Sequence, residues 1–468
     1  MSGRSGYWDG ASCYFPGRCD YAPTATKSTG SEAPIEPSEL RCSRSLDDAT
    51  SYWVPMTEET DATDLTHGKH VGISLRTCRR CLYDSSIPGT TFGSEGVCSY
   101  CVLHDEMDAQ YPTGEDGELV LKNLVYEMKE AGREKEFDCI LGVSGGCDSS
   151  YLAHAMVDRG LRPLAVHFDN TWASPIATNN IYNVLDMLKV PLETLVVDNH
   201  EYDDIYRAFI ESGVRDIEAA TDIGFMATLY QAAERHGVKY IVEGHSFRTE
   251  GVSPLGWLYM DGRYIKEVHR QHGTMPMNTF PNMPFARFVK WAAFSGIRRI
   301  RPLYWLDYDK EATKQFLASE YGWEWYGGHH LENRFTAFYH TYFLPRRFGI
   351  DMRVNELSGR VRSGQLTREE AKAEYDSDPV VDPELLAMVK KRLGYTEERW
   401  EDLMSAPRRH YTDYPTYKRT FERFRFLFWL LYKFNRVPKT FYVKFCQTQR
   451  FRGRKPEVPS RLVGEHIR

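Results

Sequence analysis

The amino-acid sequence predicts an α/β fold in which a parallel sheet carries helices on both faces, with a small four-cysteine module before it and a mainly helical region after it. Between about 137 and 243, apolar runs of strand length alternate with segments of helical periodicity, which is typical of a parallel sheet. Two Cys-x-x-Cys pairs precede this region, and segments 367–375, 383–394 and 416–433 have helical patterns after it.

Length and composition allow several domains and favour an intracellular location. The chain has 468 residues, a net charge of -6 and ten cysteines, so it can form two or three hydrophobic cores and is no disulfide scaffold. The first residues contain no apolar segment of a signal peptide, and the longest apolar run, 426–432, has seven residues, too few to cross a membrane. We therefore expect a cytoplasmic protein without a transmembrane segment.

Changes in composition along the chain predict four parts. Residues 1–70, rich in Ser, Thr, Gly, Pro and acidic residues, have no sustained periodicity, and we expect a disordered or loosely packed extension there. Residues 71–115 contain the paired cysteines, and residues 116–330 contain the alternating strands and helices. Residues 331–468 are expected to form a helical, basic C-terminal region.

Positive charge is concentrated at the carboxyl end. Residues 418–468 contain five Lys and nine Arg against three Glu, a net charge of +11, so the preceding residues carry -17. Such a tail suits nucleic acid or an anionic membrane surface, and it also suits a solvated face. Because the basic residues alternate with core-like aromatic residues, we favour the solvated face and expect no nucleic-acid partner.

Cys78, Cys81, Cys98 and Cys101 form two Cys-x-x-Cys pairs with sixteen residues between them. Each pair turns two thiolates towards one point, and two such pairs complete a closed tetrahedral site of the kind that binds Zn²⁺. A closed site leaves no position for a substrate, so we expect structural zinc that supplies folding energy to a small module. The alternatives are a chance pairing, disulfides or, less in keeping with this spacing, an iron–sulfur cluster.

The alternating region predicts the edge of the sheet at which a ligand would bind. The expected strands are 137–143, 163–168, 192–197 and 239–243, and the expected helices are 119–132, 149–159, 177–188, 202–212 and 223–236. Ligands of such sheets lie beyond the carboxyl ends of the strands, at a topological switch point. Three segments are therefore expected to enclose one site: the loop at Ser144, the strand end at 167–170 and the strand end at 244–250.

The loop Ser144-Gly145-Gly146-Cys147-Asp148-Ser149 follows the first apolar strand directly and opens a helix. Backbone N–H groups of such a turn and the positive end of the helix together bind phosphate or pyrophosphate, and the two glycines allow a close approach. Asp148 is better suited to hold Mg²⁺ on the phosphates than to contact them directly. The lysine of a Walker A loop is missing, which excludes that class of NTPase.

This loop resembles the SGGxDS motif of the PP-loop ATP pyrophosphatases, and the chain around it resembles the N-acetyl sugar amidotransferase family of bacterial O-antigen and surface-glycan biosynthesis. The resemblance extends over about residues 76–400; the extension at 1–70 departs from it, and 244–246 match it loosely. Besides the cysteine pairs and the loop, it rests on segments 76–81, 221–222, 229–230, 301–303, 322–336, 344–345 and 363–368.

The resemblance implies a HUP-like fold, the use of ATP and Mg²⁺, and conversion of the acetamido group of a nucleotide-linked N-acetyl sugar into an acetamidino group. AMP would be transferred to the amide oxygen, ammonia would add to the carbon, and AMP and pyrophosphate would be released. It further implies a separate glutaminase and a barrel-type partner that deliver ammonia. The chain itself contains no visible glutaminase motif.

The resemblance and the expected strand ends together define the candidate site residues. Catalytic roles are expected for Asp148, Ser149 and Arg301, and magnesium binding for Asp148. ATP binding is expected for Ser144, Gly145, Gly146, Asp148, Ser149, His167, Phe168, Asp169 and Gly244. Substrate contacts are expected for Asp222, Glu250, His330, Glu332 and Arg334. Structural ion pairs are the alternative for Arg301, Glu332 and Arg334, and a helix cap is the alternative for Asp222.

Two other functions fit parts of the pattern. A tRNA thiolation enzyme also combines zinc-binding cysteines with a PP-loop, but such enzymes usually need further cysteines to carry sulfur, and none lies between Cys147 and Cys446. A non-catalytic nucleotide-binding scaffold is disfavoured by the intact loop. Cys147 occupies the variable position of the loop, where we expect a buried thiol rather than a reactive one.

Overall fold

A computed structural model of the protein describes residues 75–447, except for positions 255, 329, 435 and 438–440. The extension expected at 1–70 and the last part of the basic tail lie outside the described residues. The boundaries expected between the four parts of the chain stay a prediction.

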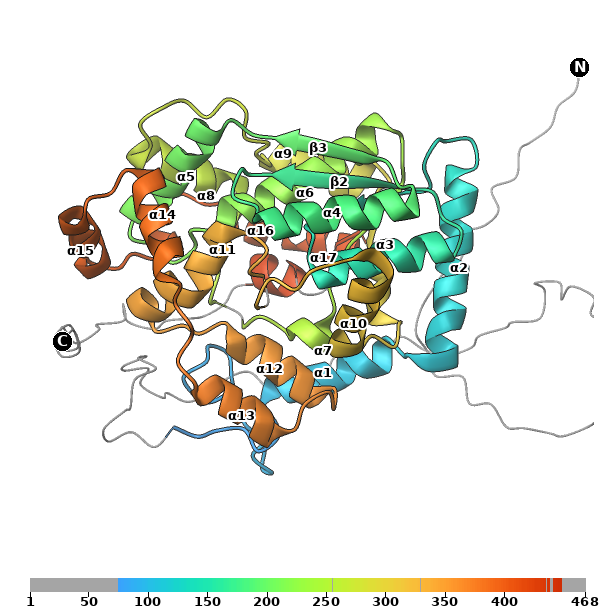
Figure 1. The fold of residues 1–468 in the computed structure, drawn as a ribbon, viewed down its shortest axis with the longest axis horizontal. Helices are drawn as coiled ribbons and strands as arrows, with labels where there is room; N and C mark the ends of the chain where they lie inside the picture. The colour runs from blue at the N-terminus through green and yellow to red at the C-terminus, as the bar shows by residue number, and fades with distance from the viewer. Residues whose placement is uncertain (1–74, 255, 329, 435, 438–440, 448–468) are drawn as a thin grey trace, which may run out of the picture. The chain divides into compact units, whose positions relative to one another are not determined.

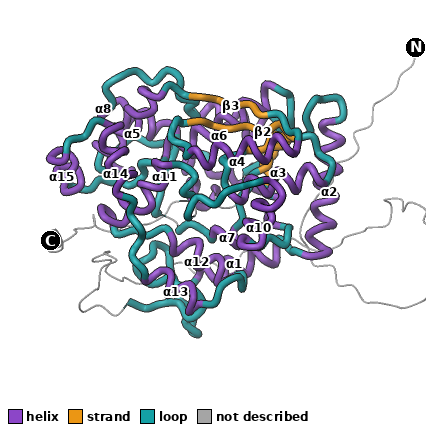
Figure 2. Tube along the Cα trace, viewed as in Figure 1, coloured by secondary structure: helices purple, strands orange, loops and turns teal. Residues whose placement is uncertain are grey.

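The described residues contain a five-stranded sheet in which every strand pair is parallel, in the order β3-β2-β1-β4-β5 (Figures 1 and 2). The strands are β1 (Cys139–Gly142), β2 (Pro163–Asp169), β3 (Leu192–Val196), β4 (Tyr240–Val242) and β5 (Arg298–Ile300). The strand order reverses between β1 and β4, so the topological switch point lies there. The expected parallel α/β architecture is confirmed.

Two hydrophobic cores lie on opposite faces of this sheet, because successive residues of a strand point to opposite sides. On β1, Leu141 belongs to one core and Ile140 to the other. The Leu141 core is completed by α2 (Gly114–Gly132), α3 (Cys147–Asp158) and α4 (Pro175–Leu188), and the Ile140 core by α5 (Asn199–Glu211) and α6 (Ala219–Arg235). All residues of β1 and β4 are buried, as expected for strands covered on both faces.

Local sequence explains where the helices beside the loop begin. Helix α4 starts after Ser174, whose side chain accepts a hydrogen bond from the N–H of Ala177, and Pro175 occupies its first position. Helix α10 (Lys310–Tyr321) starts after Asp309, which caps it in the same way, and ends at Gly322 in the left-handed conformation.

The cysteine module packs against helices from the far end of the chain. Its helix α1 (Ser99–Gln110) lies near α12 (Arg353–Arg362) and α13 (Arg368–Asp376) in Figure 1. The Tyr83 hydroxyl donates to Asn355 Oδ1 at 2.7 Å, and the N–H of Leu82 donates to Ser358 Oγ at 3.3 Å. Residues almost three hundred positions apart therefore share one interface.

The C-terminal region is mainly helical, as expected, but its aromatic segment is interrupted. Instead of one helix over 416–433, α16 (Lys418–Arg423) and α17 (Arg425–Lys433) meet at Phe424, whose ψ of 22° is not helical. The break lets both Phe421 and Phe428 pack against Phe285 and Phe441. Within the described residues, no helix is both long and apolar enough to span a bilayer.

The remaining elements connect these parts. The α-helices are α7 (Phe247–Glu250), α8 (Gly262–His272), α9 (Phe285–Val289), α11 (Arg334–Phe338), α14 (Pro383–Leu393) and α15 (Glu397–Ser405). The π-helices are η1 (Lys290–Phe294), η3 (Tyr339–Phe348) and η5 (Tyr442–Cys446), and the 3-10 helices are η2 (Pro302–Tyr304) and η4 (Tyr411–Asp413).

Candidate nucleotide site and metal centre

The loop after β1 is shaped for an anion. Gly145 has a φ of +79°, and a Cβ there would lie 2.1 Å from the carbonyl oxygen of Ala177, so only glycine fits. The N–H of Ser144 donates to Ser149 Oγ at 3.3 Å, which closes the turn. The N-cap residue of α3 is Gly146, which has no side chain to cap the helix, and the positive end of the helix at this loop suits a phosphate group.

The three segments expected to enclose the site do meet at this loop. His167, near the end of β2, makes a hydrogen bond from Nδ1 to the carbonyl oxygen of Val143 at 2.9 Å. Gly244, just after β4, packs so closely that a Cβ would lie 2.8 Å from the backbone nitrogen of Ser149. His167 lies near the carboxyl end of β2, and Gly244 follows the carboxyl end of β4. These strands are the two neighbours of β1, and the switch point lies between β1 and β4.

A fourth segment, from the carboxyl-side half of the chain, also reaches the loop. Ser144 Oγ lies 3.3 Å from Glu332 Oε1, and the N–H of Ser174 donates to the Glu332 carbonyl oxygen at 2.9 Å. Tyr326 accepts from the N–H of Cys147 at 3.4 Å. The segment around 322–336, which carried the family resemblance, thus forms part of the same site.

Asp148 is half-buried at the start of α3 and has two notable neighbours. The Tyr308 hydroxyl donates to its Oδ1 at 2.6 Å. Lys310 is only 2% exposed, and its Nζ lies 3.2 Å from Glu356 Oε1. Burial raises the pKa of Asp148, while the positive charge of Lys310 and the Tyr308 hydrogen bond oppose that rise.

His330 lies between two carboxylates beside the loop. Its Nε2 is 4.0 Å from Glu250 Oε2, and its Nδ1 is 3.9 Å from Glu332 Oε1. Burial lowers the pKa of His330, but the negative charges of Glu332 and Glu250 outweigh it and raise the pKa to about 9. His330 is thus a cation at neutral pH.

Glu250 is itself held ionised. His245 Nδ1 lies 2.6 Å from Glu250 Oε2. Burial raises the pKa of Glu250, yet the charge and hydrogen bond of His245, with the charges of His330 and Lys310, lower it to about 2. Carboxylates and cations therefore alternate around the loop.

Other candidate residues occupy different surroundings. The Phe168 ring packs into the core against Tyr202, away from the loop. Asp169 accepts from the N–H of Thr171 at 2.7 Å. Arg301 Nε lies 3.3 Å from Glu243 Oε2, which is the structural ion pair considered as its alternative.

Asp222 and Arg334 have exposed side chains. Helix α6 begins at Ala219, so Asp222 lies in its first turn and the alternative that Asp222 caps a helix is wrong.

Sequence reasoning missed three residues at this site: Tyr308 and Tyr326, which contact the loop, and Lys310, whose charge acts on Asp148. Lys310 is the first residue of α10 and follows a capping aspartate, a position at which a lysine is ordinarily solvated. Its burial depends on Glu356, which lies 46 residues further along the chain. The local sequence carries no signal of that contact.

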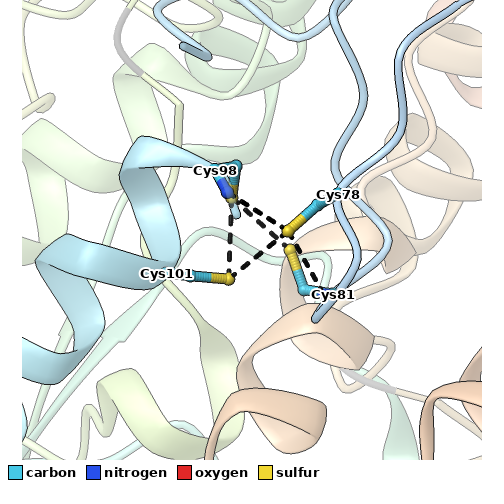
Figure 3. A group of neighbouring side chains, drawn as sticks. All are labelled: Cys78, Cys81, Cys98 and Cys101. Atoms are coloured by element: carbon cyan, nitrogen blue, oxygen red, sulfur yellow. Dashed lines mark hydrogen bonds between the residues drawn. The ribbon is translucent and has the colours of Figure 1, made fainter. Parts of the chain in front are cut away.

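The four cysteines of the module converge on one point (Figure 3). All four are fully buried, and their sulfur atoms lie within 4.8 Å of one another. The Cys78–Cys101, Cys81–Cys98 and Cys98–Cys101 sulfur distances are 3.8, 3.7 and 3.6 Å. Sulfur atoms about 2.3 Å from one tetrahedral ion are separated by roughly 3.8 Å, so the four thiols fit a single ion.

An iron–sulfur cluster fits this geometry less well. A cluster distributes its cysteine ligands over several iron atoms, which holds the sulfurs further apart than ligands of one ion. Outside the four-cysteine group, the described cysteines are Cys139, Cys147 and Cys446, all fully buried. Burial raises the pKa of the Cys147 thiol to about 12, helped by the charge of Asp148, as expected for an unreactive thiol.

Among solved structures, weak likenesses cover much of the described fold. NMN synthetase from Francisella tularensis is 12% identical, with a TM-score of 0.27, and the match covers 60% of this chain and 95% of that one. NH3-dependent NAD synthetase from Campylobacter jejuni is 13% identical, with a TM-score of 0.28, over 63% of this chain and 99% of that one. The U34-tRNA thiolase NcsA from Methanococcus maripaludis, with its [4Fe-4S] cluster, is 10% identical, with a TM-score of 0.26, over 69% and 90%. TM-scores this low support no functional inference.

The family comparison is more specific. The search of curated proteins found no match to the chain. Residues 332–428 match the model described as LPS biosynthesis protein WbpG-like, C-terminal domain. This segment begins at Glu332, which contacts the loop, and includes α12, which contacts the cysteine module. Residues 332–428 are thus similar to the C-terminal domain of WbpG-like lipopolysaccharide biosynthesis proteins, which agrees with the resemblance to a surface-glycan family.

Proposed function

We propose that the protein is an ATP-dependent amidotransferase that acts on a nucleotide-linked N-acetyl sugar. It adenylylates the acetamido oxygen and lets ammonia replace that oxygen, which gives an acetamidino sugar, AMP and pyrophosphate. One observation carries the proposal: Ser144 of an intact SGGxDS loop lies 3.3 Å from Glu332, the first residue of the WbpG-like segment. A phosphate-binding loop joined to a lipopolysaccharide biosynthesis domain supports activation of a glycan precursor.

The loop and its neighbours supply the electrostatics that this reaction needs. An amide oxygen is a poor leaving group, so transfer of AMP to it is the step that makes substitution feasible. Loop N–H groups and the positive end of α3 would bind the phosphates, and the Lys310 ammonium, whose charge acts on Asp148, would offset their charge. The Asp148 carboxylate suits Mg²⁺, which when bound neutralises phosphate charge.

Ammonia is the attacking group in this proposal, so no protein nucleophile is required. We infer that a separate glutaminase and a barrel-type partner deliver it, as the family resemblance implies. In their absence, ammonium salts would support turnover, and the rate at fixed total ammonium would rise with pH because only unprotonated ammonia attacks. Glutamine alone would not support turnover by the isolated chain.

Zinc is the ion we propose for the four cysteines, in a structural role. Four buried thiols at single-ion distances form a closed tetrahedral site, and all four positions are protein ligands. Zinc is the usual occupant of such sites.

The deciding experiment measures pyrophosphate release from ATP with Mg²⁺, ammonium and a panel of nucleotide-linked N-acetyl sugars, with bulk tRNA as a parallel acceptor. We expect sugar-dependent release and a product in which mass spectrometry finds NH in place of oxygen. Asp148→Asn is the matched inactive control. Release that depends on tRNA, or no release with any acceptor, would contradict the proposal.

Thiolation of tRNA is less compatible with the described cysteines. A sulfur carrier must be accessible and readily ionised, but Cys147 and Cys446 are both fully buried. Burial raises the pKa of the Cys446 thiol to about 12 as well, although the positive charge of Lys418 acts against it.

A further inference from the structure

Arg362, the last residue of α12, reaches into the four-cysteine group. Its Nη2 donates to Cys81 Sγ at 3.2 Å, and its Nε donates to Cys101 Sγ at 3.4 Å. The side chain is 5% exposed and lies over the Tyr83 ring, with its Cζ 4.4 Å from the ring centroid. A residue of the WbpG-like segment therefore contacts two thiols of a module that lies more than 260 residues earlier.

The charge of the metal centre explains why an arginine lies there. Four thiolates around a divalent cation carry two net negative charges, and burying them without a compensating cation is costly. The module's own backbone N–H groups donate to Cys78 and Cys81. Among the described residues, the N–H donor to Cys101 is Arg362, so the WbpG-like segment supplies a hydrogen bond that the module's own backbone does not.

The same helix contacts the nucleotide site at another position. Glu356 of α12 lies 3.2 Å from the Lys310 Nζ, and the charge of Lys310 acts on Asp148 and Glu250. Just beyond α12, Ser363 Oγ donates to the Arg248 carbonyl oxygen at 2.9 Å, within α7, the helix that ends at Glu250. Helix α12 is thus held by the cysteine centre and in turn holds two charged residues beside the loop.

We propose that Arg362 is a positioning residue that completes the metal centre from the C-terminal domain, and that the bound metal thereby holds α12 in place for nucleotide binding. Metal retention and nucleotide binding are then coupled in both directions, because a coupling free energy between two sites is reciprocal. The coupling rests on the proposed function, since it requires ATP at the loop, whereas the role of Arg362 at the thiols does not.

The first test compares Arg362→Gln with Arg360→Gln in the full chain loaded with zinc. Arg360 lies on the same helix and is also buried, but it pairs with Glu311 at 3.2 Å. We expect a chelator to withdraw zinc from Arg362→Gln about tenfold faster or more, the usual effect of removing an outer partner of a metal ligand. Arg360→Gln should release zinc at the wild-type rate.

Equal release rates for the two variants and the wild type would overturn the role of Arg362. If Arg362→Gln does not fold, Arg362→Lys tests the same role. It keeps the positive charge but loses the paired N–H groups that donate to Cys81 and Cys101. Its zinc release should be faster than that of the wild type, and a wild-type rate would again overturn the proposal.

The second test uses the wild-type protein and the reciprocal effect. ATP with excess Mg²⁺, without sugar or ammonium, should slow zinc release about fivefold or more. Glu356→Gln should abolish this slowing while leaving the release rate without ATP unchanged. An unchanged rate with ATP bound, as verified by calorimetry, would overturn the coupling. No ATP binding would contradict the proposed function and the coupling together, whereas the Arg362 variants would still decide the metal role.

Discussion

At the scale of single residues, the candidate site is a balance of charges around the loop. Glu250 and Glu332 are carboxylates whose pKa values are lowered, and two acids beside a phosphate site would repel the anion. His330 and Lys310 supply the compensating positive charge, and the raised pKa of His330 keeps it protonated at neutral pH. Because this balance includes the charge of His330, loss of the His330 proton should change the stability of the protein.

His330→Asn should remove a pH-dependent contribution to stability. The substitution keeps a side chain that tolerates the φ of +60° at this position. Because the folded pKa is raised above the unfolded value of about 6.5, the stabilisation is complete below that pH and is lost as the pH rises through about 9. The melting temperatures of the wild type and the variant, measured from about pH 6 to pH 10, should therefore converge at alkaline pH.

His340→Asn is the matched control for this experiment. Burial, with the charge of His330, lowers the pKa of His340 to about 3, so this ring is neutral throughout the range. Its removal should shift the melting temperature by the same amount at every pH. A constant difference between the wild type and His330→Asn would contradict the assigned charge of His330.

Lys310→Gln should abolish most pyrophosphate release. Lys310 is buried, and its positive charge acts on Asp148. Loss of one preorganised charge at a transition state typically costs about 10² in rate. Lys314→Gln, one turn along α10, removes a lysine that pairs with Glu311 at 3.0 Å and should leave the rate near that of the wild type. Circular dichroism checks folding, and a fully active Lys310→Gln would exclude Lys310 from the mechanism.

At the scale of elements, the site depends on how closely the end of β4 approaches the start of α3. A Cβ on Gly244 would lie 2.8 Å from the nitrogen of Ser149 and 2.9 Å from the carbonyl carbon of Asp148. Both are backbone atoms, which cannot rotate away as a side chain does. The first turn of α3 is therefore supported from behind by the neighbouring strand end.

Gly244→Ala should displace the loop and weaken ATP binding. Overpacking of this kind costs about 1–3 kcal/mol of unfolding free energy, and the shift falls on the phosphate-binding turn itself. Gly93→Ala is the control, because a Cβ there would lie 3.8 Å from the Val97 carbonyl oxygen, an ordinary contact. Denaturant unfolding and calorimetric ATP titration measure the two effects. Wild-type ATP affinity in Gly244→Ala would show that this approach is not needed.

Periodicity predicted the long elements and failed for short or polar ones. The strand 163–168 and the helix 177–188 were predicted within two residues at each end, because each buries an unbroken apolar face.

Strand β5 was missed because it has three residues, two of them arginines that pair with Glu127 and Glu243. Helix α12 was missed because its buried residues include Arg360 and Arg362, whose partners are distant in sequence. The loop could be predicted from local sequence, whereas Lys310 could not.

At the scale of the whole described region, the WbpG-like segment packs against the loops at the end of the sheet. Asn333 forms an antiparallel bridge with Ala173, and its side chain donates to Asn170 Oδ1 at 2.9 Å. Arg392 of α14 lies 2.9 Å from Asp203 of α5 and covers the Trp172 ring at 4.0 Å. These contacts join the WbpG-like segment to the loop after β2, which borders the candidate site.

Arg392→Gln should loosen this docking and destabilise the protein as a unit. The substitution leaves Asp203 with Trp172 as its remaining hydrogen-bond donor and removes the donation to the Thr171 carbonyl oxygen, at 2.6 Å. Hydrogen bonds to charged groups contribute about 1.5–3 kcal/mol, so we expect a loss of roughly 2 kcal/mol in unfolding free energy. Lys391→Gln, at an exposed neighbouring position, is the control and should have little effect.

The form of the transition decides whether the docking is cooperative. In versions of the wild type and of Arg392→Gln whose other tryptophans are replaced by phenylalanine, fluorescence reports on Trp172 at the interface, and far-ultraviolet circular dichroism reports on the helices of both halves. If the two halves fold together, the curves from both probes coincide in the wild type and shift together in Arg392→Gln. Curves that separate in the variant would mean that the C-terminal domain unfolds on its own. In that case, a site that needs both Ser144 and Glu332 would lose ATP affinity at denaturant concentrations that leave the sheet intact.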